Sequence, residues 1–308
     1  MEKEIEKLTR ITVPELDEVL GKAFKVLDDG FVRVVDYMGS DASIVQAARV
    51  SYGAGTKTMN DDETLIRYLI RHKHTSPFEM CEIKFHLRVP MDCWRQWIRH
   101  RTANVNEYST RYSIAIASAY GTKEDQWRMQ ALRNKQGSEG FIDIKTGKEL
   151  TKREQELQEL LKMEYKKRID LGVAREQARK DLPLSTYTEA YWKIDLNNLL
   201  HFLELRMESK AQLEIRKYSE TIGEEVVKRW CPIVWAAFKE YQFEPVKLSR
   251  TEEKIINLIA KNDIAGALKT AEETGFIKKK EDGIKRSLEC LELEDKITRL
   301  GISVPWKQ

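Results

Sequence analysis

The segment between Trp94 and Tyr112 holds the side chains best suited to chemistry. Five arginines but only two acids lie between Arg88 and Arg111. Arginine is a planar, permanently charged partner for phosphate groups. The residues that follow the arginines add hydroxyl and amide groups, at Asn104, Asn106, Ser109 and Thr110. Arginines beside a donor-rich loop suit a nucleotide that carries a phosphate and a uracil edge.

Two other interpretations of this segment stay open. Arginines at a helix end are commonly solvated or ion-paired, and tryptophan interleaved with arginine also permits stacking on nucleic acid. The whole chain has 53 Lys and Arg against 50 Asp and Glu. Because a general polyanion binder should show an obvious basic excess, this balance argues against nucleic acid as a partner.

The elements around this segment can be predicted from its pattern. Residues 81–89 alternate between apolar and polar side chains, which is typical of a strand. Residues 91–100 form a predicted helix, on which Gln96 lies three and four positions before Arg99 and His100. These three side chains therefore share one face, while Trp94 and Trp97 can anchor the helix in a core.

The rest of the chain is predicted to be mostly helical. We expect a helical segment over 1–28, a strand over 31–35, an exposed loop or hairpin over 133–152, and one strongly helical region over 195–238. The other predicted helices span 41–49, 64–72, 154–168, 173–181, 252–261, 264–273 and 284–300.

Composition indicates a globular protein with no membrane segment. Of the 308 residues, 41% are hydrophobic and 33% are charged, and no apolar run approaches the roughly 18 residues that span a bilayer. The charged start lacks a signal-peptide core, so we expect a cytoplasmic protein. The four cysteines, Cys81, Cys93, Cys231 and Cys290, form no paired metal-ligand motif. We expect free structural thiols and no metal site.

The residues from Arg95 to Tyr112 resemble the flavin-dependent thymidylate synthase family. Its signature is Arg-His-Arg, seven residues of any type and Ser, which matches Arg99-His100-Arg101 and Ser109. Further similar segments run from about residue 27 to 245: Ala48-Arg49-Val50-Ser51, His72-x-His74, Pro77-Phe78-Glu79, Ala178-Arg179, Leu205-Arg206 and Ala211-Gln212-x-Glu214-Ile215.

This resemblance implies a function and a set of site residues. Family members methylate dUMP to dTMP, with methylenetetrahydrofolate as carbon donor and NADPH-reduced FAD as hydride source. Arg206 matches the arginine that stabilises uracil ionisation. The other implied dUMP contacts are Gln96 and Arg99 from one subunit, and Glu107, Ser109, Arg111 and Arg179 from another. The implied FAD contacts are Ser76, Arg99, His100, Arg101, Glu107, Asp195, Asn197 and His201, and His74 and Lys210 are candidate folate or flavin contacts.

The resemblance also implies an α/β (α+β) fold and an assembly. The family fold has a central, largely antiparallel sheet beside long helices, and it forms homotetramers with shared sites. We therefore expect an N-terminal helical extension over 1–27, the family domain over 28–246 and a helical C-terminal extension over 247–308. Lys210 replaces a histidine typical of the family, and we expect it on the same helix face as Arg206. This departure leaves room for a divergent homologue that binds the nucleotide but has altered or lost flavin chemistry.

Overall fold

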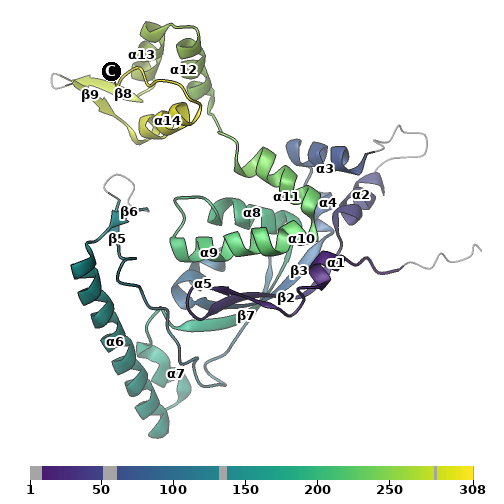
Figure 1. The fold of residues 1–308 in the computed structure, drawn as a ribbon, viewed down its shortest axis with the longest axis vertical. Coiled ribbons are helices and arrows are strands. Elements are labelled where there is room, and N and C mark those ends of the chain that lie inside the picture. The colour runs from purple at the N-terminus through teal and green to yellow at the C-terminus, as the bar shows by residue number, and fades with distance from the viewer. Residues whose placement is uncertain (1–8, 51–60, 132–136, 281–282, 308) are drawn as a thin grey trace, which may run out of the picture. The chain divides into compact units, whose positions relative to one another are not determined.

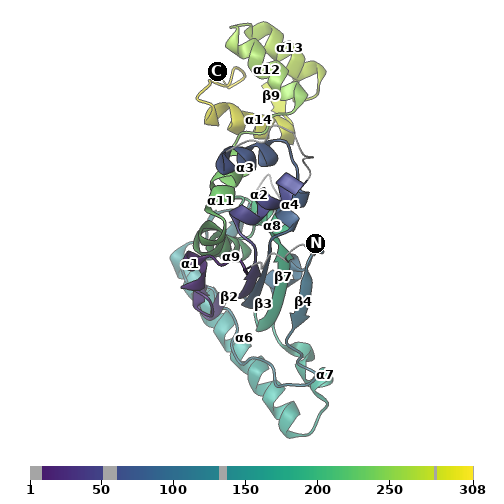
Figure 2. The same ribbon diagram turned by 90° about the vertical axis from the view of Figure 1, so that its right-hand side faces the viewer.

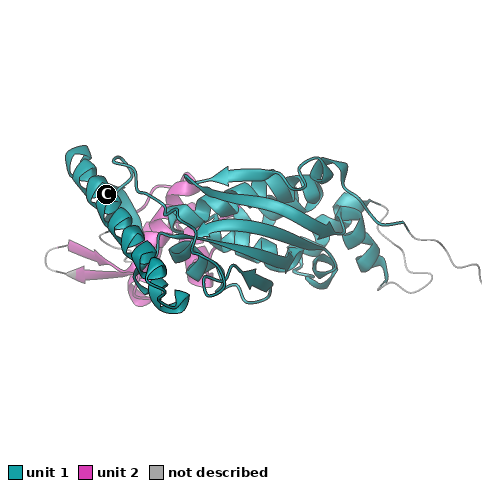
Figure 3. Cartoon of the chain, turned by 90° about the horizontal axis from the view of Figure 1, so that it is seen from below, with its two compact units in different colours: residues 1–243 teal, residues 244–308 magenta. Residues whose placement is uncertain are grey.

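The structure, a computed structural model, describes residues 9–50, 61–131, 137–280 and 283–307. Contacts divide the chain into two compact units, residues 1–243 and residues 244–308, coloured separately in Figure 3. Each unit has a hydrophobic core of its own. Within the described residues, no helix has the length and apolarity needed to cross a membrane.

The larger unit is built on a five-stranded antiparallel sheet, as expected for the α+β class. Its strand order is β1-β2-β3-β7-β4, and Figure 2 shows β2, β3, β7 and β4 side by side. The strands are β1 (Ala23–Val26), β2 (Gly30–Met38), β3 (Glu82–Pro90), β7 (Tyr187–Asp195) and β4 (Asn104–Glu107). The predicted strands over 31–35 and 81–89 are confirmed, whereas β7 was not anticipated.

Alternation along β3 decides which face of the sheet is buried. Ile83, Phe85 and Leu87 are buried, and Phe85 lies opposite Trp192 of β7. Figure 1 shows α8, α9 and α10 on this face. Burial of these large apolar side chains against the helices is the main stabilising contribution to the unit.

Helices make up most of the remainder of this unit. They are α1 (Pro14–Asp17), α2 (Asp41–Val50), α3 (Asp62–Arg71), α4 (Ser76–Glu79), α5 (Met91–Trp97), α6 (Ile144–Asp170), α7 (Arg175–Ala178), α8 (Leu196–Arg206), α9 (Leu213–Thr221), α10 (Lys228–Trp230) and α11 (Pro232–Phe238). Three non-α helical segments, Arg179–Asp181, Ile222–Val227 and Lys239–Phe243, continue α7, α9 and α11.

Two helical predictions for this unit are wrong. The N-terminal segment holds only the short α1 and the strand β1 among its described residues. The region 195–238 is interrupted after Arg206. There the side-chain carboxylate of Glu208 accepts the backbone N–H of Lys210 at 2.9 Å, and the backbone carbonyl of Glu208 accepts the N–H of Ala211 at 2.9 Å. These local bonds compete with helical ones. Lys210 therefore lies in a loop and does not share a helix face with Arg206.

Residues 128–170 form a hairpin followed by a long helix. The strands β5 (Arg128–Gln130) and β6 (Ser138–Phe141) pair with each other, and residues 132–136 lie outside the described residues. Asp143 then caps α6 by accepting the N–H of Thr146 at 3.0 Å. The helix predicted over 154–168 is thus present but begins earlier than expected.

The C-terminal unit packs three helices and a hairpin. They are α12 (Arg250–Ala260), α13 (Ile264–Glu273), β8 (Ile277–Lys280), β9 (Gly283–Arg286) and α14 (Leu288–Arg299). The hairpin replaces the start of the helix predicted over 284–300. The buried carboxylate of Glu294 accepts bonds from Trp306 and Arg286 and pairs with Lys307, so it fastens the chain end to α14.

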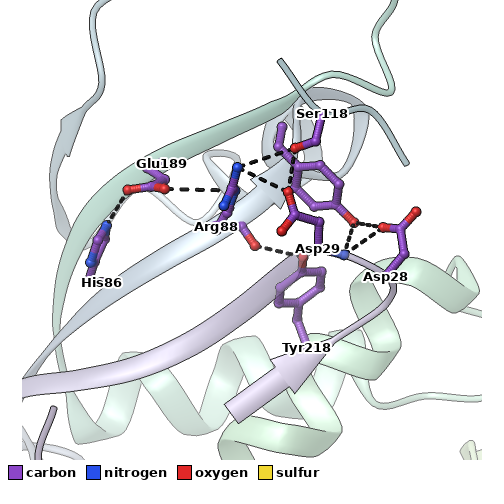
Figure 4. Close-up of polar contacts among 8 residues, drawn as sticks. Asp28, Asp29, His86, Arg88, Ser118, Glu189 and Tyr218 are labelled. Atoms are coloured by element: carbon purple, nitrogen blue, oxygen red, sulfur yellow. Dashed lines mark hydrogen bonds and ion pairs between the residues drawn. The ribbon is translucent and has the colours of Figure 1, made fainter. Parts of the chain in front are cut away.

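The other face of the sheet carries a polar network around Arg88 (Figure 4). Arg88 forms an ion pair with Asp29 at 3.0 Å and donates to Ser118 at 3.3 Å, and Glu189 lies 2.8 Å from His86. His86 is therefore held by partners rather than simply solvated. The network ties the β1–β2 turn to the start of β7.

Candidate functional site

A cavity of about 420 Å³ lies where the end of α5 meets α8. It brings together the complete Arg99-His100-Arg101 motif with His201 and Arg206. All five are nitrogen-rich side chains, and the three guanidiniums carry permanent positive charge. Such a cavity is suited to an anionic, hydrogen-bonding ligand.

Arg206, the last residue of α8, is fixed by two contacts to the α5 end. Its Nε–H donates to Nε2 of His100 at 3.0 Å, and NH2 donates to the carbonyl of Gln96 at 3.3 Å. Burial lowers the pKa of Arg206, yet an arginine stays charged in proteins. The guanidinium is therefore a fixed positive charge at the cavity wall.

His100 is held in its neutral form. Burial lowers its pKa to about 4, and the charges of Arg206 and His201 act in the same direction. Since Nε2 accepts the bond from Arg206, the proton of the neutral ring lies on Nδ1. His100 thus orients Arg206 without competing with it for an anion.

A second group of predicted residues lies on β4 and the loop after it. Glu107 accepts a hydrogen bond from Thr188 at 2.9 Å, and Arg179 donates to Thr110. Arg111 forms an ion pair with Glu176 at 3.3 Å, with both side chains more than half exposed. Such exposed pairs contribute little stability, so the Arg111 guanidinium stays accessible to an anion.

Arg179 is not engaged by the two acidic side chains nearest to it in sequence. Glu176 pairs with Arg111, and Asp181 pairs with Arg168 at 2.5 Å. The contact of Arg179 instead goes to a hydroxyl on the loop that also carries Ser109. Arg111 and Arg179 are therefore brought to the same loop.

The residues of the second group are not among those that line the cavity of Arg206. Ile194 lines the cavity of Arg206, whereas Thr188 contacts Glu107. These two residues lie six apart on β7, which corresponds to roughly 20 Å along a strand. Within one chain, the two groups therefore lie at different points along β7.

The remaining predicted residues are not among those that line the cavity. Asp195 caps α8 through the N–H of Asn198 at 2.9 Å, and Asn197 lies in the first turn of that helix. Ser76 begins α4, which packs against α8, and His74 precedes it by two residues. The exposed Lys210 is not among the residues that line the cavity.

Sequence reasoning missed four residues of the cavity wall: Thr102, Ile194, Asn198 and Leu205. Asn198, His201 and Leu205 follow the spacing of one helix face. Counting this spacing forward from the N-cap at Asp195 would have predicted two of the four, Asn198 and Leu205. Ile194 could not be found in this way because β7 was not anticipated.

The surroundings of the cysteines do not favour a reactive thiolate. All four are free, as predicted, and all four are buried. Burial raises the pKa of the Cys93 and Cys231 thiols and raises that of Cys290 to about 12. A thiolate nucleophile needs the opposite shift. Among the residues that the structure describes, no cluster of His, Cys, Asp and Glu could hold a metal ion.

Comparison with known proteins assigns the family. Residues 33–233 match the sequence family described as "Thymidylate synthase complementing protein". The chain belongs to this family, which the Arg99–Ser109 motif had indicated.

Similar curated proteins carry the name "Flavin-dependent thymidylate synthase". One from Wolbachia pipientis wMel is 53% identical and covers 84% of this chain and 90% of its own length. One from Ehrlichia ruminantium (strain Gardel) is 50% identical and covers 91% of this chain and 92% of its own length. The uncovered part in this second match is smaller than the C-terminal unit, so the similarity extends beyond residue 245, where the motif-based resemblance ends.

Two solved structures have a similar fold. They are of the UMP/dUMP methylase PolB from Streptomyces cacaoi, bound with 5-Br dUMP in one case and 5-Br UMP in the other. The first has a TM-score of 0.62 at 31% identity, covering 71% of this chain and 98% of PolB. The second has a TM-score of 0.63 at 32% identity, covering 70% and 96%.

Proposed function

We propose that this protein methylates dUMP to dTMP as a FAD-dependent thymidylate synthase, with methylenetetrahydrofolate as carbon donor and NADPH as reductant. The observation that carries the proposal is the cavity in which Arg206 is held against neutral His100 beside the family motif. The names of the relatives and the ligands of PolB support the same chemistry.

Arg206 is the proposed catalytic residue. A fixed, partly buried guanidinium stabilises negative charge that develops on a bound uracil ring, and its preorganisation avoids a cost of reorientation during the reaction. Neutral His100 keeps the guanidinium oriented without adding a second positive charge. No cysteine takes part in this account, in agreement with the raised pKa values of Cys93, Cys231 and Cys290.

The dUMP site is proposed to be shared between subunits of a homotetramer. Gln96, Arg99 and Arg206 come from one copy, and Glu107, Ser109, Arg111 and Arg179 from another, with Arg111 and Arg179 on the phosphate. The separation of roughly 20 Å along β7 supports this division. Guanidinium groups suit phosphate because they bind it through paired hydrogen bonds.

The residues around the cavity fit a flavin dinucleotide. Arg99 and Arg101 offer charge to its pyrophosphate, and His201 and the start of α8 lie beside them. The proposed FAD contacts are Ser76, Arg99, His100, Arg101, Glu107, Asp195, Asn197 and His201, and His74 is a proposed folate or flavin contact. When bound, FAD supplies the hydride for the methyl group after reduction by NADPH.

The proposal divides the chain into a catalytic domain over 28–246 and a C-terminal extension over 247–308, and it places the enzyme in the cytoplasm. Since the extension has its own core, we assign it no catalytic residue.

The visible absorption spectrum of the purified protein tests the proposal. A flavin spectrum that NADPH bleaches, together with saturable dUMP binding, is the expected result. A folded protein that carries no flavin and takes none up from added FAD would contradict it.

A further inference from the structure

A chain of side-chain hydrogen bonds leads from Gln96 into the protein. Gln96 donates its Nε2–H to Oε1 of Gln212. Gln212 in turn donates its Nε2–H to Oδ2 of Asp92 at 3.3 Å, and the same nitrogen lies 3.9 Å from Sγ of Cys93. Asp92 and Gln96 lie one turn apart on α5, whereas Gln212 immediately precedes α9.

The carboxylate at the inner end gives this chain a direction. An ionised carboxylate only accepts hydrogen bonds, so the side of the Gln212 amide that faces Asp92 is the NH2 group. The carbonyl of Gln212 then faces Gln96, so Gln96 must donate to it through its own NH2 group. The carbonyl Oε1 of Gln96 is consequently left to accept a hydrogen bond from a group other than Gln212 or Asp92.

The backbone beside Gln212 is itself fixed. Glu214 is buried, and its carboxylate accepts two bonds from Arg128, at 2.7 and 3.0 Å. A buried carboxylate that lost its partner would be strongly destabilising, so this pair anchors the start of α9. Arg216 also donates to the carbonyl of Ser209 at 2.6 Å, which closes the loop that ends at Gln212.

We propose that Gln212 and Asp92 are positioning residues, which orient the Gln96 amide so that its carbonyl faces an N–H or O–H donor of the nucleotide. This role rests on the proposed function of Gln96 as a dUMP contact. Without the hydrogen bonds from Gln96 through Gln212 to Asp92, the Gln96 amide could present either its oxygen or its nitrogen to the substrate. A wrongly presented amide leaves a polar group of the ligand unpaired.

A double-mutant cycle on dUMP binding tests the proposal. The variants are Gln212→Leu, Gln96→Leu and the double variant, titrated with dUMP as flavin-loaded proteins. Each single change should weaken binding by about tenfold. The double variant should bind no more weakly than Gln96→Leu alone, because Gln212 acts only through Gln96. Losses that multiply in the double variant would overturn the proposal.

Asp92→Asn provides a second variant that keeps the shape of the side chain. The new amide can face Gln212 with either its oxygen or its nitrogen, so the direction of the chain is no longer enforced. Binding should weaken by a few fold, and this effect too should vanish in the Gln96→Leu background. An undiminished effect in that background would count against the proposal, even if Gln212→Leu does not fold.

Gln158→Leu is the matched control. Gln158 is also half-buried and donates two bonds, to the Tyr120 carbonyl (2.9 Å) and to Ser185 Oγ (3.2 Å), but it does not contact Gln96. It should lower the melting temperature and leave dUMP affinity unchanged. A wild-type protein that does not bind dUMP would refute the proposed function itself. Wild-type binding with equal losses in Gln158→Leu and Gln212→Leu would refute only the positioning role.

Discussion

Arg206 donates its Nε–H to Nε2 of His100 at 3.0 Å, and this contact joins the end of α8 to the family motif that follows α5. The histidine is an acceptor in this bond, so it must be neutral. Burial and the neighbouring positive charges lower its pKa to about 4 and keep it neutral near pH 7. The contact therefore sets both the orientation of the proposed catalytic arginine and the protonation state of its partner.

The first prediction concerns acid stability. Between the usual histidine pKa of about 6.5 and the folded value of about 4, the unfolded chain binds a proton at His100 that the folded chain does not. Folding stability should therefore fall as the pH is lowered through this window. Urea unfolding at pH 7.5 and pH 5 should show a smaller loss for His100→Gln than for the wild type. Equal losses would mean that His100 is not held neutral by the fold.

The second prediction concerns the shared site. Arg206→Ala and Arg179→Ala should each abolish most dTMP synthesis, since they remove different halves of one site. When the two variants are coexpressed, a site can combine an intact half from each chain, so about one quarter of the wild-type activity should return. Coexpression of two differently tagged Arg206→Ala chains is the matched control, because both chains lack the same half and no site can be completed. Activity that stays absent in the first pair would place both groups in one chain.

The third prediction concerns phosphate recognition. Arg179 contacts a hydroxyl and has no carboxylate among the partners that the described residues give it. Arg179→Ala should weaken dUMP binding by about 2–3 kcal/mol and leave the flavin content unchanged. Arg153→Ala removes an exposed arginine of α6 that pairs with Glu156, and it should change neither quantity. Equal dUMP affinity in wild type and Arg179→Ala would remove Arg179 from the site.

The fourth prediction concerns the cysteines. Single replacement of Cys81, Cys93, Cys231 or Cys290 by Ala should keep dTMP formation within about tenfold of wild type. All four are buried, so lost packing should lower stability by roughly 1–2 kcal/mol. Turnover that disappears in a stably folded single variant would show that a thiol takes part in the chemistry.

The Arg99-His100-Arg101 part of the candidate cavity could be recognised from the sequence alone, whereas the strand β7 beside it could not. Arg99, His100 and Arg101 are adjacent in the chain, so their motif is visible without any structure. The contact between His100 and Arg206 joins residues far apart in sequence, and only the family resemblance linked them. Spacing alone gives no such pairing.

The errors have identifiable physical causes. The region after Arg206 has good helical composition, yet side-chain and backbone bonds from Glu208 stop the helix there. The expected proximity of Arg206 and Lys210 on one helix face fails for that reason. The strand β7 places Ala190, Trp192 and Ile194 on the buried face, but this short alternation runs directly into the apolar start of α8, so its pattern does not separate it from the helix that follows.

Conversion of dUMP by the purified enzyme tests the central claim most directly. The protein is incubated with dUMP, methylenetetrahydrofolate and NADPH, and dTMP is measured by chromatography, with each component omitted in turn. The account predicts that dTMP forms only when all three are present and that Arg206→Ala forms almost none. A folded, flavin-containing wild-type protein that binds dUMP but forms no dTMP would contradict the account and would favour a homologue that has lost the flavin chemistry.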